Sequence, residues 1–427
     1  LTVDIEEYGS QHIDSKDIAI AHALDFAKLV KSMAPAATTV NVICDGLCIS
    51  REIIQDNLGR DLDEKIVEKL ANVLYPDTKH AYLTLSDVCI NHLSILNSIP
   101  PLSKLNLYNE EFSDAYTSLM HKSAYTLQYL SIPTAAADKL IHDENNDALV
   151  YPNLQYLQLL TNYRAGPNTM AMSSTVTPFP VLRNLKLGAP YPFNDDVLFR
   201  GNTATLKSLS LCLDHNTITT LSKCRVFESK HKVLRSVTIT RYDSDLHTSV
   251  NSEVSVDKFL NHLVDSAERL NVAASRMGEV CLSAIEHGQG FKSIKVLKLS
   301  EDLSIFDVFK ILKAIPTLVE LRCGIKSLGP ELDNISDSEL PDYIASTYCD
   351  VGNNFQIWDM SSLNHQFIPT LIGFMLGLVL LCPRLRKISV CFDCLEVFQA
   401  KIADALNNQL LSKHAPQLNQ LLDIICE

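Results

Sequence analysis

The strongest pattern along the chain is a six-residue motif of apolar and polar positions, L-x-x-L-x-L, in which another apolar residue can replace a leucine. Nine clear copies begin at residues 102, 127, 154, 182, 206, 234, 294, 318 and 385, and weaker copies occupy residues 37–42 and 80–85. From 102 to 234 the copies follow at intervals of 24 to 28 residues, and the later intervals are 60, 24 and 67. Such spacing predicts one structural unit per copy, each stacked on its neighbours.

Each copy predicts a short β-strand. Because strand side chains alternate between two faces, the fourth and sixth positions are expected to point into the core, and the third and fifth outward. Between the strands, each unit is expected to return through a helix or a loop, and apolar residues at i, i+3, i+4 and i+7 favour helices. These returns are expected at residues 17–33, 61–74, 87–98, 255–287, 303–314, 367–382 and 394–411. Asp17, Asp87 and Asp302 are the predicted N-caps.

The pattern predicts an α/β fold, a leucine-rich-repeat solenoid shaped as a curved horseshoe, with a parallel concave sheet and outer helices. The interval of about 24–28 residues matches the period of leucine-rich repeats. We expect one continuous domain over residues 1–427, with diverged repeats at 1–100, regular repeats at 101–240, and irregular repeats with long helices at 241–427. The gaps at 240–293 and 324–384 hold either diverged repeats or functional insertions.

Three segments carry a family resemblance. They are residues 191–202 (YPFNDDVLFRGN) running into 204–209, residues 327–330 (SLGP) followed by 340–343 (LPDY), and residues 355–358 (FQIW). With these segments the chain resembles the leucine-rich-repeat half of F-box proteins, and more specifically a large family of fungal proteins from the Kickxellales moulds. The resemblance implies the substrate-recognition half of a ubiquitin-ligase adaptor, or a relative without the F-box. A ligase subunit would then bind a segment upstream of residue 1.

Composition and charge narrow the class of protein. Hydrophobic residues make up 46% of the chain and charged residues 20%, which is typical of a folded globular protein. Leucine is unusually frequent, with 62 of 427 residues. The 37 basic and 50 acidic residues give a formal net charge of −13. Because nucleic-acid-binding proteins rely on positive charge, we expect no nucleic-acid partner.

The twelve cysteines are scattered through the chain. This distribution predicts reduced thiols in an intracellular protein, cytoplasmic or nuclear. The close pair Cys391 and Cys394 lacks a second ligand pair nearby, so we expect no metal and no cofactor, with a metal or redox role for this pair as the alternative. The uncharged segment 367–382 is short for a membrane span and contains Pro369, so we expect no membrane association.

The sequence contains none of the common catalytic motifs. It has no G-x-x-x-x-G-K-[ST], H-E-x-x-H or G-x-S-x-G pattern and no EF-hand loop. We therefore expect a protein that is not an enzyme. An enzyme with an active site built from loops on one rim remains the alternative.

The outward strand positions carry an unusual charge. In eleven copies, the second, third and fifth positions hold ten basic residues and one acidic residue, Glu320, and three third positions hold tyrosine. Ordinary solvation of exposed strand positions would also place polar residues there. The predicted partner-binding residues are Tyr82, Lys104, Tyr129, Tyr156, Arg183, Lys186, Lys207, Arg235, Lys298 and Arg322.

A basic concave face with tyrosines suits an acidic or phosphorylated protein partner. The sequence therefore predicts a non-catalytic protein-interaction scaffold. A leucine-rich-repeat regulator without a ubiquitin link, for example of a small GTPase, is the alternative within the same class.

Overall fold

The structure is a computed structural model that describes part of the chain. For residues 2–4, 41–43 and 81–85 only the backbone is described. The described residues are 2–4, 41–43, 81–85, 101–107, 114–137, 139–142, 147–160, 176–188, 196–202, 204–213, 215–222, 234–242, 256–274, 277–287, 290–327, 329, 335–336, 339–348, 351–363, 374–375, 377–378 and 381–390. The chain divides into two compact units, Leu1–Leu206 and Lys207–Glu427, and each is described by itself. The expected single domain over residues 1–427 stays a prediction.

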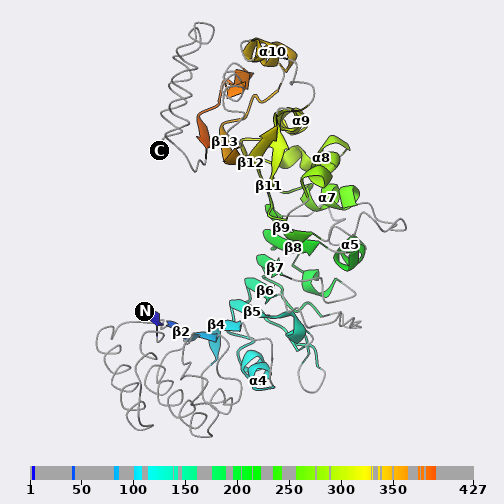
Figure 1. The fold of residues 1–427 in the computed structure, drawn as a ribbon. Coiled ribbons are helices and arrows are strands. Elements are labelled where there is room, and N and C mark those ends of the chain that lie inside the picture. The colour runs from blue at the N-terminus through cyan, green and yellow to red at the C-terminus, as the bar shows by residue number, and fades with distance from the viewer. Residues whose placement is uncertain are drawn as a thin grey trace, which may run out of the picture. The chain divides into compact units, whose positions relative to one another are not determined.

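In the first unit, the described residues form parallel strands that pair in chain order (Figure 1). The strands are β1 (Thr2–Asp4), β2 (Asn41–Ile43), β3 (Ala81–Leu85), β4 (Leu102–Leu107), β5 (Tyr129–Pro133), β6 (Tyr156–Leu160) and β7 (Asn184–Leu187). The connections carry α4 (Asp114–Lys122) and the 3-10 helices η3 (Thr134–Ala136) and η4 (Val197–Phe199).

The second unit repeats this plan, again with parallel strands paired in chain order. Its described strands are β8 (Ser208–Leu213), β9 (Ser236–Tyr242), β10 (Arg269–Val272), β11 (Val296–Ser304), β12 (Glu320–Ser327), β13 (Ile357–Leu363) and β14 (Lys387–Val390). Its helices are α5 (His215–Ser222), α7 (Val256–Val264), α8 (Gly278–His287), η6 (Gly290–Ser293), α9 (Ile305–Ala314) and α10 (Leu340–Thr347). Each unit is thus a mixed α/β structure with an open parallel sheet.

Helices α7, α8 and α9 lie side by side on one side of the strands of the second unit (Figure 1). Asn261 of α7 donates from Nδ2 to the carbonyl of Ala284 in α8 at 2.9 Å. Lys310 of α9 pairs with Glu286 of α8 at 2.9 Å. The opposite side of these strands is therefore the side on which the outward positions are presented.

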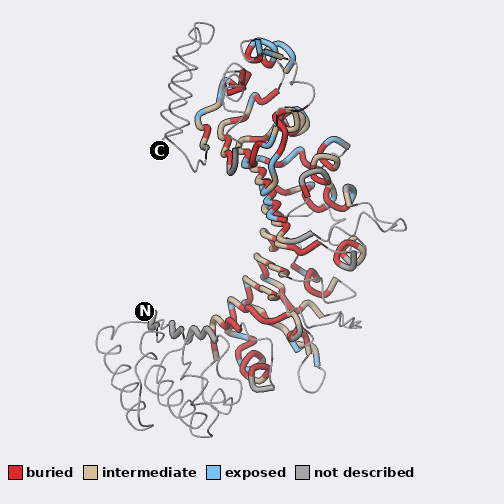
Figure 2. The backbone as a smooth tube through the Cα atoms, in the orientation of Figure 1, coloured by how far each residue is buried: buried red, intermediate tan, exposed pale blue. Residues whose placement is uncertain are grey.

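The predicted inward positions form the core. In β6, for example, Leu157 and Leu159 are at most 1% exposed, whereas Tyr156 and Gln158 are half-buried. Figure 2 shows buried residues along the strands and helices of each unit. The prediction that every fifth position points outward into solvent is wrong at two places, because Asn106 of β4 and Ser131 of β5 are buried.

Each of the two long intervals contains a further strand in register with its neighbours. Strand β10 belongs to a diverged copy at residues 267–272 (AERLNV), with Leu270 and Val272 buried in the fourth and sixth positions. Strand β13 belongs to a copy at residues 355–360 (FQIWDM), with Trp358 and Met360 buried in the same positions. Both gaps therefore hold diverged copies.

The prediction of one uninterrupted return at residues 255–287 is consequently wrong. Helices α7 and α8 are separated by strand β10. This segment forms a strand because the exposed residues Arg269 and Asn271 alternate with buried apolar residues, which is the period of two of a β-strand. The register predicted for the weak copy at residues 37–42 is also wrong, by two residues. Asn41 pairs with Tyr82, so Asn41 occupies a third position.

The helix predicted at 303–314 is confirmed as α9, but its N-cap is not Asp302. Strand β11 runs on to Ser304, which caps the helix. Ser304 Oγ accepts from the backbone N–H of Asp307 at 3.1 Å, and the Asp307 carboxylate accepts from the backbone N–H of Ser304 at 3.2 Å. This reciprocal pair satisfies two N–H groups at the start of the helix.

A polar residue directly before the first position ties many copies to the preceding one. Thr126 donates from Oγ1 to the carbonyl of Leu102 at 2.7 Å, and Thr317 donates to the carbonyl of Ile294 at 2.8 Å. Four other residues donate in the same way to a backbone carbonyl within two residues of the first position of the preceding copy. We call all six the stitching residues. They are Thr126, Asn153, Thr205, Ser266, Thr317 and Asn354.

The apolar segment 367–382 lies mostly outside the described residues. Of its described members, Phe374 is buried and packs edge-on against Trp358, with ring centres 5.0 Å apart, and against Phe309 at 5.3 Å. Gly377 lies so close to Ile344 of α10 that a Cβ atom would come within 2.9 Å of the Ile344 Cβ. Among the described helices, none has the length and hydropathy needed to cross a bilayer.

The remaining predicted helices at residues 17–33, 61–74, 87–98 and 394–411 lie outside the described residues, as do the N-caps Asp17 and Asp87.

Candidate partner-binding face

We define the strand face of each unit as the side chains at the second, third and fifth positions of its copies. In the first unit, the register aligns Lys104, Tyr129, Tyr156 and Asn184 at third positions of four adjacent strands. Neighbouring strands of a sheet are about 4.8 Å apart, so these side chains are brought into contact.

Lys104, Tyr129 and Tyr156 form a continuous row, which we call the tyrosine ladder. The Lys104 Nζ lies 4.3 Å from the centre of the Tyr129 ring. The rings of Tyr129 and Tyr156 stack with centres 4.3 Å apart and planes within 6°. Tyr156 Oη donates to Gln158 Oε1 at 3.0 Å on the same strand. Three residues predicted from the sequence thus contact one another in one row.

The other predicted residues of the first unit lie around this ladder. Tyr82 pairs with Lys104 through the backbone at the third position, and its side chain lies outside the described part of the structure. Arg183 is exposed at the second position next to β7, and Lys186 is half-buried at a fifth position, in register with Gln158.

In the second unit, charged residues at second positions follow one another on adjacent strands. The backbone N–H of Arg235 donates to the carbonyl of Lys207 at 2.8 Å, that of Glu268 to Arg235 at 2.9 Å, and that of Lys295 to Glu268 at 2.7 Å. Arg269 follows at the neighbouring third position and is exposed. We call Lys207, Arg235, Glu268, Arg269 and Lys295 the basic cluster.

A single carboxylate lies within this cluster. Glu268 accepts a hydrogen bond from Lys295 Nζ at 2.9 Å. That hydrogen bond and the charge of Lys295, with smaller contributions from Arg235 and Arg269, lower the pKa of Glu268 below its ordinary value. Two arginines and a lysine therefore act on the same carboxylate.

Two of the predicted binding residues are held in ion pairs farther along the face. Lys298 Nζ lies 3.3 Å from Glu320, and Arg322 Nε lies 3.5 Å from Asp359. Both pairs are partly exposed, where an ion pair contributes only about 0–1 kcal/mol to stability. Asp359 was not anticipated as a face residue, because its copy was hidden in the second long interval.

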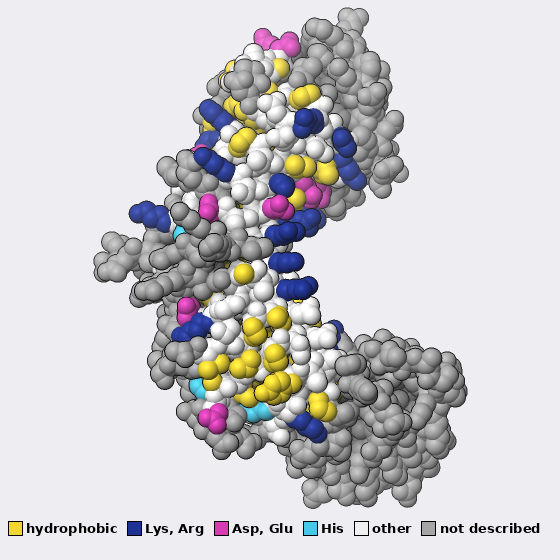
Figure 3. Space-filling model, turned by 180° about the vertical axis from the view of Figure 1, so that it is seen from behind, with side chains coloured by type: hydrophobic (Ala, Val, Ile, Leu, Met, Phe, Trp, Pro, Cys, Tyr) yellow, Lys and Arg dark blue, Asp and Glu magenta, His cyan; other side chains and the backbone are white. Residues whose placement is uncertain are grey.

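With the two diverged copies included, the strand face of the second unit holds eight basic and three acidic residues, a surplus of five positive charges. Figure 3 shows Lys and Arg side chains gathered close together on this unit with Asp and Glu beside them. Glu268, Arg269 and Asp359 were missed from the sequence. The signal that could have found them is the alternation of buried and polar residues around Leu270 and Trp358.

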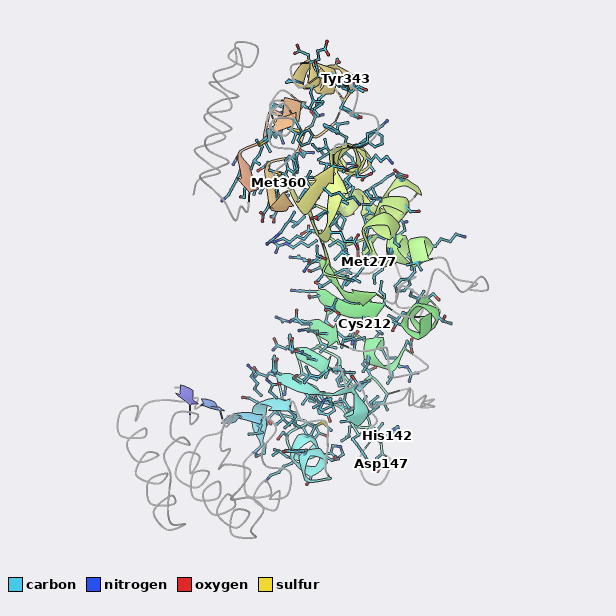
Figure 4. The ribbon with its side chains drawn as sticks, in the orientation of Figure 1. His142, Asp147, Cys212, Met277, Tyr343 and Met360 are labelled. Carbon is cyan, nitrogen blue, oxygen red and sulfur yellow. The ribbon has the colours of Figure 1, made fainter. Side chains whose placement is uncertain are left out.

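Among the described residues, no group of three or more His, Cys, Asp or Glu side chains is placed to hold a metal ion. Cys212 on β8 (Figure 4) and Cys281 are buried cysteines. Burial raises the pKa of both Cys323 and Cys382 to about 12, so these two thiols stay protonated at neutral pH. Cys391 and Cys394 lie outside the described residues.

No protein-family model and no curated protein matches this chain. The strand face of the first unit carries the tyrosine ladder, and that of the second unit carries the basic cluster.

Proposed function

We propose that this chain is a non-catalytic protein-interaction scaffold, a leucine-rich-repeat solenoid that binds a protein partner on its strand face. The observation that carries the proposal is the surplus of five positive charges on the strand face of the second unit, in a chain whose net charge is −13. Such a local reversal of charge attracts an acidic or phosphorylated partner and repels basic ones.

The tyrosine ladder supports the same role. Tyrosine contributes a large contact area and a polar group while losing little side-chain entropy, and it is enriched where proteins bind one another. Tyr129 and Tyr156 are already held by stacking and by the hydrogen bond to Gln158, so little further ordering is needed on binding.

The place of this scaffold in the cell rests on the resemblance in sequence. Residues 191–202, 327–330 and 355–358 resemble segments of the repeat half of F-box proteins. On that basis the chain acts as the substrate-recognition half of a ubiquitin-ligase adaptor, or as a relative that works without an F-box.

Affinity capture of the tagged full-length gene product from its own cells, followed by mass spectrometry, tests the proposal. Recovery of ligase adaptor and cullin subunits supports the ligase role. Recovery of other partners without those subunits ends the ligase role and leaves a plain scaffold, for which a regulator of a small GTPase is one form.

A triple charge reversal tests whether the strand face is responsible. Capture of the partner is expected to be abolished in a variant that combines Lys186→Glu, Arg235→Glu and Lys298→Glu. The matched control reverses Lys139, Lys258 and Lys313, which are exposed and lie outside the strand faces. Both proteins should retain the circular dichroism of the parent. Full capture by the strand-face variant would rule out binding at this face.

A further inference from the structure

The basic cluster contains cations that form no ion pair of their own in the described part of the chain. Lys295 is engaged by Glu268, whereas Lys207, Arg235 and Arg269 make no ion pair with a described carboxylate. Arg235 and Arg269 are close enough to Glu268 to affect its pKa, yet they lie beyond salt-bridge distance from it. Three exposed positive charges are therefore available on three adjacent strands.

The arrangement of these cations is a row. Lys207, Arg235 and Glu268 are joined through consecutive backbone hydrogen bonds, one residue per strand, and Arg269 lies at the next position of the third strand. Adjacent strands are about 4.8 Å apart, so the cations are spread across the sheet and do not converge on one point. A row of this kind matches several anionic side chains along an extended segment better than it matches one compact anion.

The ligand that the cluster already accepts is a carboxylate. Glu268 lies between Arg235 and Lys295 on the strand order and takes a hydrogen bond from Lys295. The pair is about half exposed, with 54% of the Lys295 side chain and 46% of the Glu268 side chain accessible, so a carboxylate from another chain can reach the same place.

We propose that Lys207, Arg235 and Arg269 bind the carboxylates of an Asp/Glu-rich extended segment of the protein partner, and that Glu268 is a built-in competitor that weakens this binding. The inference rests on the proposed scaffold function and names the chemistry of its partner. In the free protein Glu268 offsets part of the positive charge near Arg235 and Arg269. A partner carboxylate has to approach against this negative charge, so Glu268 restricts binding to segments that carry several carboxylates.

The floor beneath the row is polar and small. Ser208 pairs in register with Ser236, and Ser210 with Thr238, at third and fifth positions of β8 and β9. These short side chains leave room for an extended backbone to lie across the strands.

The surroundings favour a protein segment over a membrane surface. Among the described residues, the large exposed hydrophobic side chains are Tyr125, Val181 and Tyr343, and none of these lies on β8 to β12. A lipid-binding surface places apolar side chains beside its basic residues so that they enter the bilayer. That combination is missing from the described part of this face.

Fluorescence polarisation with the full-length protein at low salt tests the inference. The probe is a labelled peptide of alternating glutamate and serine, compared with one of alternating glutamine and serine. We expect the glutamate peptide to bind at least about ten-fold more tightly. Arg235→Gln with Arg269→Gln should weaken its binding about ten-fold, whereas the matched control, Lys258→Gln with Lys313→Gln, should leave binding unchanged.

Glu268→Gln gives a test that loss of folding cannot mimic, because a gain is expected. Removal of the competing carboxylate should tighten binding of the glutamate peptide about three-fold or more. Unchanged or weaker binding by a folded Glu268→Gln protein would overturn the role of Glu268. Equal binding of the glutamate and glutamine peptides would overturn the carboxylate site.

Two further arms separate the chemical alternatives. The first arm uses a phosphoserine peptide of equal net charge, and the second uses vesicles that contain a phosphoinositide. If either probe binds about ten-fold more tightly than the glutamate peptide, the carboxylate assignment is overturned in favour of a phosphate ligand. If the glutamate peptide does not bind, but capture of a partner from cells still depends on the strand face, this inference is overturned and the proposed function stands. Peptide binding without face-dependent capture would instead overturn the proposed function.

Discussion

Tyr129 and Tyr156 stack face to face with their ring centres 4.3 Å apart, because the strands that carry them pair residue for residue at the third position. Lys104 extends the same row from the neighbouring strand, with its Nζ 4.3 Å from the Tyr129 ring centre. Cross-strand pairs of this kind are the main side-chain contribution to the stability of a sheet. The ladder therefore stabilises the first unit as well as presenting a surface.

Tyr156 separates the two contributions. Tyr156→Ala removes the stacked ring and is expected to lower the free energy of unfolding by about 1–3 kcal/mol. Tyr156→Phe keeps the ring and removes the hydrogen bond to Gln158, so a loss below about 1 kcal/mol is expected. Urea titrations followed by circular dichroism measure both changes. Equal losses in the two variants would show that the ring contact contributes nothing.

Thr317 tests the stitching residues. Its Oγ1 hydroxyl bonds to the carbonyls of Ile294 at 2.8 Å and Lys292 at 2.7 Å, so Thr317→Val leaves both acceptors without this donor while keeping the shape. We expect a loss of about 1–2 kcal/mol in the free energy of unfolding. Thr317→Ser keeps the hydroxyl and is the control, with a smaller loss. A valine variant as stable as the serine variant would contradict the stitching role.

Glu268 gives a prediction about pH. Its pKa is lowered chiefly by the hydrogen bond and charge of Lys295, so the ionised form is favoured in the folded state. The interaction therefore contributes to stability above the ordinary pKa of glutamate and is lost as the pH falls through the lowered value. In Lys295→Met, the pKa of Glu268 should rise toward its ordinary value.

A titration of the Glu268 side-chain carboxyl by NMR measures this change. Lys292→Met is the control, because Lys292 is exposed nearby in the chain and does not contribute to the pKa of Glu268. A Glu268 pKa that stays lowered in the Lys295 variant would assign the effect to Arg235 and Arg269 alone.

The buried thiols make a prediction about reactivity. Since burial raises the pKa of Cys323 and Cys382 to about 12, both should stay unmodified by N-ethylmaleimide in the folded protein at neutral pH. In denaturant both should react fully. Peptide mass spectrometry identifies the modified cysteines. Rapid modification of Cys323 under native conditions would mean that β12 opens readily.

The copies that begin with leucine could be predicted because, apart from Cys323, every inward position in them is aliphatic. Residues 154–159 show this clearly, with leucine at the first, fourth and sixth positions. The copy at 267–272 was not recognised because Ala267 and Val272 stand in place of two leucines. The copy at 355–360 was not recognised because Phe355, Trp358 and Met360 stand in place of all three. All of these side chains are fully or almost fully buried. The core can therefore be filled by several apolar residue types, whereas a search for the leucine motif finds only one of them.

The candidate site was predictable in its positions and less so in its charges. Alternation along each strand correctly placed Tyr129 and Lys298 on the strand face. Pairs such as Lys298 with Glu320 depend on which residues of two strands lie opposite each other, and this register is set by packing between copies. The cap at Ser304 was missed for a similar reason, because β11 continues past the end of its leucine motif.

The stitching residues have a consequence for how such a chain changes in length during evolution. Each stitching side chain belongs to the later copy, and its acceptor is a backbone carbonyl, a group that every residue supplies whatever its side chain. A duplicated copy therefore brings its own donor and finds an acceptor already in place. A gene can gain or lose one whole copy of roughly 25 residues without requiring a compensating mutation in the copy next to it.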